Sequence, residues 1–77
     1  MPKMPRISAK EAIRALERLG FEQVRQTGSH SHVVMKKDTQ EGEIGCVVPL
    51  HRELKIGTLS GVIKQARITV EDFIDNL

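Results

Sequence analysis

Aromatic residues are nearly absent from this chain of 77 residues, which has no tryptophan, no tyrosine and only Phe21 and Phe73. Its core must therefore be built from Ile, Leu, Val and Ala side chains. A single cysteine, Cys46, excludes an internal disulfide and a zinc-ribbon framework. The sequence also lacks the long apolar run that a signal peptide or a membrane span requires. We therefore expect one small domain over residues 1–77 in the reducing cytoplasm.

A large excess of charge of one sign is also missing. The formal net charge is +2 and the isoelectric point is near 9.0, values that permit a nucleic-acid partner without requiring one. A glycine-rich phosphate loop is missing as well, because the segment 57–61 has neither the lysine nor the spacing of a P-loop. The composition thus excludes internally disulfide-linked, zinc-ribbon and P-loop proteins but does not indicate a particular function.

The first helix is the clearest element in the sequence. Pro2 and Pro5 indicate an extended lead-in over residues 1–7, after which Ser8 and Glu11 form the pattern of a capping box. Gly20 stands where a Schellman ending needs it. Apolar residues at helical spacing predict one buried stripe, made of Ala9, Ala12, Ile13, Leu16 and Leu19.

Three strands and two helices are expected after this helix. Alternation and turn residues predict strands at 21–27, 31–37 and 44–49, with Val24 as the buried residue of the first and a turn at 38–43. After an irregular link at 50–56, apolar spacing predicts a second helix through residues 59–66. A short third helix at 70–77 follows Thr69 as its N-cap. The order predicts an α+β domain whose helices cover one face of a three-stranded antiparallel sheet.

The segment 25–32, Arg-Gln-Thr-Gly-Ser-His-Ser-His, is the most chemically distinctive part of the chain. Gly28 allows the backbone to reverse, and His30 leaves the turn at the edge of the sheet. An imidazole with a pKa near 6.5 can work as a general acid or base on a phosphodiester. Two alternatives stay open: a metal site with His32 and a third ligand such as His51, or an exposed turn histidine without a role.

Basic residues near this segment are candidates for contacts with RNA phosphates. Ser29 is expected to be a turn hydroxyl beside the RNA rather than a nucleophile, because no His-Asp partners can be identified for it. The predicted RNA-binding residues are Arg25, Ser29, Lys36, Lys37, Arg52 and Lys55. We expect no metal and no other cofactor.

Five motifs, in order, resemble those of the HicA-type (YcfA-like) toxins. They are a helix ending in Gly-Phe, Arg-Gln-x-Gly-Ser-His at 25–30, Val-Pro-x-His at 48–51, Gly-Thr-Leu at 57–59 and Ile-Lys-Gln-Ala at 63–66. The resemblance implies a fold like that of double-stranded-RNA-binding domains, cleavage of mRNA, and a HicB-type antitoxin that covers the active site. It also implies that His30 is the catalytic histidine.

Two positions depart from the family pattern. Arg67 stands where relatives often have glycine after the second helix, which would strain the backbone if a positive φ is needed. The Gly-Ser-His motif is followed here by Ser31 and then His32, whereas relatives commonly have a histidine directly after the motif. No role is therefore transferred to His32. Two other functions stay open: a non-catalytic RNA-binding module, and an interaction subunit that has lost its activity.

Overall fold

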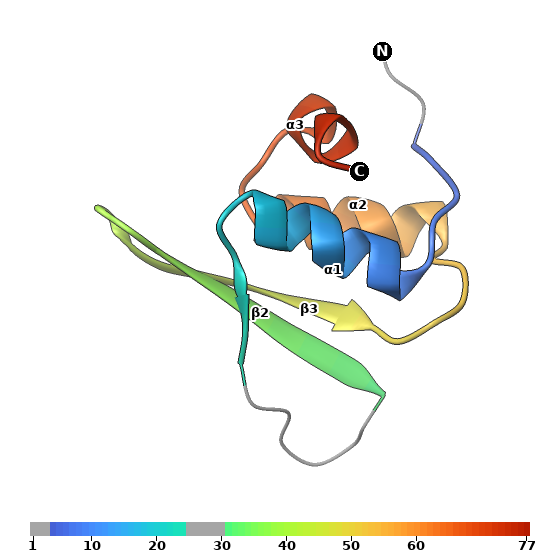
Figure 1. The fold of residues 1–77 in the computed structure, drawn as a ribbon, viewed down its shortest axis with the longest axis horizontal. Helices are drawn as coiled ribbons and strands as arrows, with labels where there is room; N and C mark the ends of the chain where they lie inside the picture. The colour runs from blue at the N-terminus through green and yellow to red at the C-terminus, as the bar shows by residue number, and fades with distance from the viewer. Residues whose placement is uncertain (1–3, 25–30) are drawn as a thin grey trace.

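The fold is a three-stranded antiparallel sheet with its helices on one side. The computed structural model describes residues 4–24 and 31–77. In sequence order its elements are α1 (Ala9–Arg18), β1 (Glu22–Gln23), β2 (His32–Thr39), β3 (Gly42–Pro49), α2 (Ile56–Gln65) and α3 (Val70–Asp75). The strand order is β1-β2-β3, and Figure 1 shows α1 and α2 above the sheet with α3 beyond them. The predicted α+β arrangement is confirmed.

One face of the β2–β3 hairpin forms the floor of the core. Val33 and Met35 of β2 and Cys46 and Val48 of β3 are all buried, as period-2 alternation requires of residues that share a face. Burial raises the pKa of the Cys46 thiol to about 11, so this cysteine is a protonated core residue at neutral pH. The largest fully buried side chains are Phe73, Leu16, Met35, Leu54, Leu59, Val48 and Cys46.

Both ends of α1 have the predicted structure. The Ser8 hydroxyl accepts from the Glu11 N–H, and the Glu11 carboxylate accepts from the Ser8 N–H, each at 3.2 Å. At the other end Gly20 has a φ of 99°, and the Phe21 N–H donates to the Leu16 carbonyl at 2.9 Å. These contacts form a capping box and a Schellman ending. Sequence pattern alone was sufficient here because both motifs are local.

The first strand is shorter than predicted, and the prediction that Val24 is its buried residue is wrong. Strand β1 contains only Glu22 and Gln23, and residues 25–30 of the predicted strand and turn lie outside the described chain. Val24 is 37% exposed, because its N–H donates to Val34 and this register places it on the face away from the helices. Phe21, just before the strand, is the buried residue instead.

The remaining boundaries differ from the prediction by a few residues. The turn after β2 is shorter than expected, since Thr39 pairs with Gly42 and the Thr39 hydroxyl donates to the Gly42 carbonyl at 2.7 Å. Helix α2 begins at Ile56, and α3 ends at Asp75. The N-cap of α3 is confirmed, because the Thr69 hydroxyl accepts from the Asp72 N–H at 3.0 Å. No described helix is long and apolar enough to cross a membrane.

Helix α2 also ends in a Schellman motif, but with arginine in the left-handed position. Arg67 has a φ of 55°; its N–H donates to Lys64, and the Ile68 N–H donates to Ile63. A residue with a Cβ is strained in this conformation by about 1–2 kcal/mol. Helix α2 therefore ends as it would with glycine at this position, but Arg67 holds the left-handed conformation under strain.

Replacing Arg67 with glycine is expected to stabilise the protein by up to about 1 kcal/mol, since part of the strain relief is offset by the greater freedom of glycine in the unfolded chain. The melting temperature should rise by a few degrees in a domain of this size. Arg67→Ala is the control, because alanine keeps the Cβ. Equal melting temperatures for the two variants would show that the positive φ costs nothing.

Candidate nucleic-acid interface

Three of the predicted site residues, Arg25, Ser29 and His30, lie outside the described residues. The structure nevertheless defines the surface on which this segment begins and ends, because Val24 and Ser31 are both described. It also places the other four predicted residues, which are Lys36, Lys37, Arg52 and Lys55. These four are not gathered into one cluster.

Lys37 contacts the end of α1. Its ammonium group donates to the Leu19 carbonyl at 2.8 Å and lies 5.8 Å from the centre of the Phe21 ring. A cation at a helix C-terminus interacts favourably with the helix dipole, and Gly20 leaves room for the lysine chain, since a Cβ there would lie 3.2 Å from Lys37 Cε. The contacts of Lys37 are therefore those of a residue that supports the fold.

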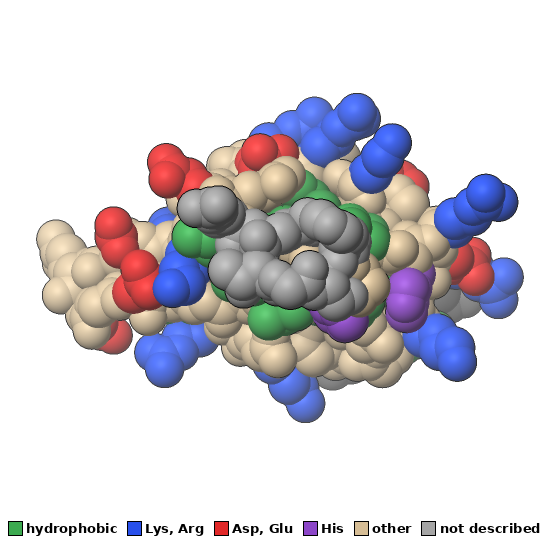
Figure 2. Space-filling model, turned by 90° about the horizontal axis from the view of Figure 1, so that it is seen from below, with side chains coloured by type: hydrophobic (Ala, Val, Ile, Leu, Met, Phe, Trp, Pro, Cys, Tyr) green, Lys and Arg blue, Asp and Glu red, His purple; other side chains and the backbone are tan. Residues whose placement is uncertain are grey.

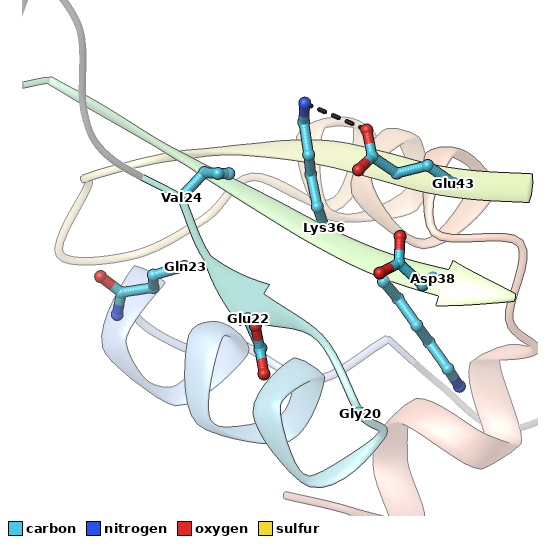
Figure 3. A pocket seen from close by; sticks show the side chains of 8 residues that line it. Gly20, Glu22, Gln23, Val24, Lys36, Asp38 and Glu43 are labelled. Carbon is cyan, nitrogen blue, oxygen red and sulfur yellow. Dashed lines mark ion pairs between the residues drawn. The ribbon is translucent and has the colours of Figure 1, made fainter.

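Lys36 projects from the opposite face of β2, as alternation along a strand requires. Its ammonium group forms an ion pair with Glu43 at 3.1 Å, which Figure 3 shows as a dashed line. The adjacent hollow is also lined by Glu22 and Asp38. Three carboxylates therefore line the same hollow as the exposed lysine, and they oppose the binding of an RNA phosphate at this end of the sheet.

Arg52 and Lys55 lie in the segment between β3 and α2, and both are exposed. Lys55 is the N-cap of α2, and within this fully described helix no acidic residue occupies the first turn and no side chain caps the N-terminus. The positive end of the helix dipole therefore adds to the charge of Lys55. The exposed Glu53 lies between Arg52 and Lys55, so the ionised side chains of the segment have a small positive excess. With the helix N-terminus, this makes the segment the more favourable of the two regions for a phosphate group.

Backbone hydrogen bonds connect this basic segment to Ser31, just before β2, and to the start of α1. The Leu50 N–H donates to the Ser31 carbonyl at 2.8 Å, and the Ala9 N–H donates to the His51 carbonyl at 3.0 Å. Ser31 directly follows His30 in the sequence, and its hydroxyl lies 2.8 Å from Nδ1 of His32. The structure thus places the chain that leaves the Gly-Ser-His motif beside the Val-Pro-x-His motif.

The charged groups are therefore distributed unequally between the two ends of the sheet. In Figure 2 several Lys and Arg side chains project at the end of the molecule where the described histidines lie, with carboxylates also among them, and further carboxylates lie toward the hairpin end. A cavity of about 420 Å³ opens at the histidine end, between Ser8, Ala9 and Lys10 of the α1 N-terminus and Leu50, His51 and Arg52. We call this the α1–β3 cavity.

Lys10 and Leu50 are residues of this surface that the sequence did not indicate. Lys10 is one of several exposed charges on a helix, and Leu50 follows a strand without any polar pattern. Only the hydrogen bonds of Leu50 and His51 bring them together. The exposure of Leu50, 41%, is the one signal that distinguishes it from a core leucine, and it is visible only in the folded chain.

No group of three His, Cys, Asp or Glu residues within the described chain is arranged to hold a metal ion. His32 and His51 are both exposed. The predicted pairing of His30 with His32 falls partly outside the described residues, so the metal alternative for His30 is not tested by this arrangement.

The family model described as the HicA toxin of bacterial toxin–antitoxin systems matches residues 9–68. The chain belongs to the HicA toxin family. Membership gives it a toxin role, a nuclease activity and an antitoxin as partner. The matched range includes the Gly-Ser-His motif, all three strands and α2. No relative was found among the curated proteins.

Substitution of the two adjacent lysines is expected to separate their roles. Lys37→Ala should lower the free energy of unfolding by about 1–2 kcal/mol, because a charged hydrogen bond to a helix carbonyl is lost together with a cation–π contact. Lys36→Ala is the matched control, since an exposed ion pair contributes at most about 1 kcal/mol and often nothing measurable. Urea denaturation measures both. Equal losses would show that the contacts of Lys37 contribute no more stability than the exposed ion pair of Lys36.

Proposed function

We propose that this HicA-family chain is a metal-independent mRNA endoribonuclease in which His30 is the single catalytic side chain. The observation that carries the proposal is the position of Ser31, the residue after His30, which is hydrogen-bonded to the basic segment that contains Arg52 and Lys55. An RNA held there would have a phosphate beside Ser31, the residue that follows the Gly-Ser-His motif in the sequence. The family match over residues 9–68 supports the nuclease class.

The proposed chemistry uses a nucleophile that the substrate itself provides. The ribose 2′-hydroxyl attacks the adjacent phosphorus while the bond to the 5′-oxygen of the next nucleotide breaks. His30 either removes the proton from the 2′-hydroxyl or donates one to the leaving oxygen, a role that typically contributes about 10²–10⁴-fold. Basic side chains stabilise the additional negative charge on the phosphate in the transition state.

His30→Ala is expected to reduce RNA cleavage by at least about 10²-fold and to remove growth inhibition, with an unchanged circular dichroism spectrum and melting temperature. An oligonucleotide with 2′-deoxyribose throughout should resist the parent protein, because it lacks the nucleophile. The same cleavage assay in EDTA should give the parental rate.

Three results would contradict this mechanism. A His30→Ala chain that still cleaves RNA would exclude the catalytic role, and loss of cleavage in EDTA with recovery in zinc or manganese would establish a metal enzyme. RNA binding by the parent chain without cleavage would identify a non-catalytic RNA-binding module instead.

We further propose that the antitoxin is of the HicB type and binds over the same basic surface. Arg52 and Lys55 are exposed, so an acidic partner surface would accelerate association through long-range attraction. The face of the sheet that no described helix covers offers apolar contacts, because Val24, which directly follows β1, Val34 of β2 and Val47 of β3 are paired with one another in a row. Apolar contacts of this kind slow dissociation, whereas rim charges mainly change the association rate.

Charge reversal at Arg52 and Lys55 together should therefore slow antitoxin association and reduce its salt dependence, while RNA cleavage also falls. Arg14→Glu with Lys64→Glu is the matched control, because it makes the same change of net charge at exposed positions on α1 and α2. Stopped-flow association at several salt concentrations measures the effect. Reduced cleavage with unaltered antitoxin kinetics would place the antitoxin on another face.

A further inference from the structure

The α1–β3 cavity has a lining that no catalytic step in the proposed mechanism uses. Its floor includes the apolar Ala9 and the exposed side chain of Leu50, and its rim includes Lys10, His51 and Arg52. Among the described residues that line it, none is acidic. Two carboxylates are close in sequence to the lining residues: that of Glu11, which accepts hydrogen bonds from Ser8, and that of the exposed Glu53, which follows Arg52.

This combination of groups matches the parts of a nucleotide. An apolar surface beside an imidazole can stack against a nucleobase, whose two faces are apolar and whose edges stay hydrated. The cationic side chains of Lys10 and Arg52, which line the same cavity, can contact the phosphates of the nucleotide. At about 420 Å³, the volume lies in the range of small-molecule pockets and is large enough for one base.

The hollow beside Lys36 provides the internal comparison. It is lined by Glu22, Asp38 and Glu43 as well as by Lys36 and Lys37, and both lysines already have partners. A polyanion is disfavoured there and favoured at the α1–β3 cavity, because carboxylates outnumber the lysines in the first lining, whereas the charged residues of the second are Lys10 and Arg52. The RNA strand is therefore expected to run toward Lys10 rather than toward the hairpin tip.

We propose that the α1–β3 cavity is a nucleotide subsite, in which Leu50 and His51 hold one unpaired base near the scissile phosphate and Lys10 and Arg52 contact its flanking phosphates. The inference rests on the proposed function, since it deepens the description of the same RNA site. It assigns roles in RNA binding to Lys10, Leu50 and His51.

The test measures RNA binding separately from cleavage. The full chain carrying His30→Ala is titrated against a fluorescent single-stranded oligouridine and against an abasic ribose-phosphate oligomer of the same length. Leu50→Ala and His51→Ala in this background should each weaken oligouridine binding about tenfold, the scale of one lost base stack. Neither should change binding of the abasic oligomer. Lys10→Glu should weaken the binding of both.

Two matched variants control for changes that are not specific to the cavity. Leu77 is as exposed as Leu50, at 42% against 41%, so Leu77→Ala removes a similar apolar surface elsewhere. Lys64→Glu repeats the charge change of Lys10→Glu at the far end of α2. Both controls should bind the two oligomers as their parent does.

The outcomes test the proposed subsite separately from the proposed nuclease activity. Unaltered oligouridine binding in Leu50→Ala and His51→Ala would overturn the subsite, even if the parental chain cleaves RNA. Equal weakening on both oligomers would also overturn it, because the cavity would then contact only phosphate. Failure of the chain to bind either oligomer would have the same consequence. Base-dependent weakening would support the subsite even if the parental chain proved unable to cleave.

Discussion

The antiparallel pairing of β2 with β3 is the constraint on which the rest of the structure depends. Its register places Val33 opposite Val48 and Met35 opposite Cys46, so these four side chains form one continuous apolar face. A shift of β2 by one residue would move Val33 and Met35 to the opposite face and turn Lys36 toward the helices. The helices can cover only the apolar face, and the opposite face, with Val34 and Val47, has no described helix over it.

The same alternation assigns different roles to two adjacent lysines. Lys37 follows Met35 on the helix side and reaches the end of α1, whereas Lys36 points away from the helices and pairs with Glu43. A run of two basic residues in a strand is therefore not a basic patch. It supplies one charge to each face, and the chemistry of each charge is decided by the groups it meets there.

Charge is separated along the length of the sheet as well as between its faces. Carboxylates lie around Lys36 toward the hairpin end, and basic groups lie around the α1–β3 cavity at the other end. A small protein with a net charge of only +2 can bind a polyanion if its positive charges are concentrated in this way. Such an asymmetry would also orient the RNA strand relative to the Gly-Ser-His motif.

The sequence by itself determined the features that are local in the chain. The capping box at Ser8 and the Schellman ending at Gly20 follow from residues within a few positions of each other, because hydrogen bonds over three to five residues form them. The order of helices and strands follows from the spacing of apolar residues and from turn residues along the chain. The family-typical motif around His30 was also visible, and its role stays a prediction. Only the tertiary structure decided that Val24 is exposed, that Lys36 and Lys37 diverge, and that Lys10 lies beside Leu50 and His51. These facts depend on strand register and on hydrogen bonds between distant segments, such as Ala9 to His51, and residue spacing in the sequence contains neither.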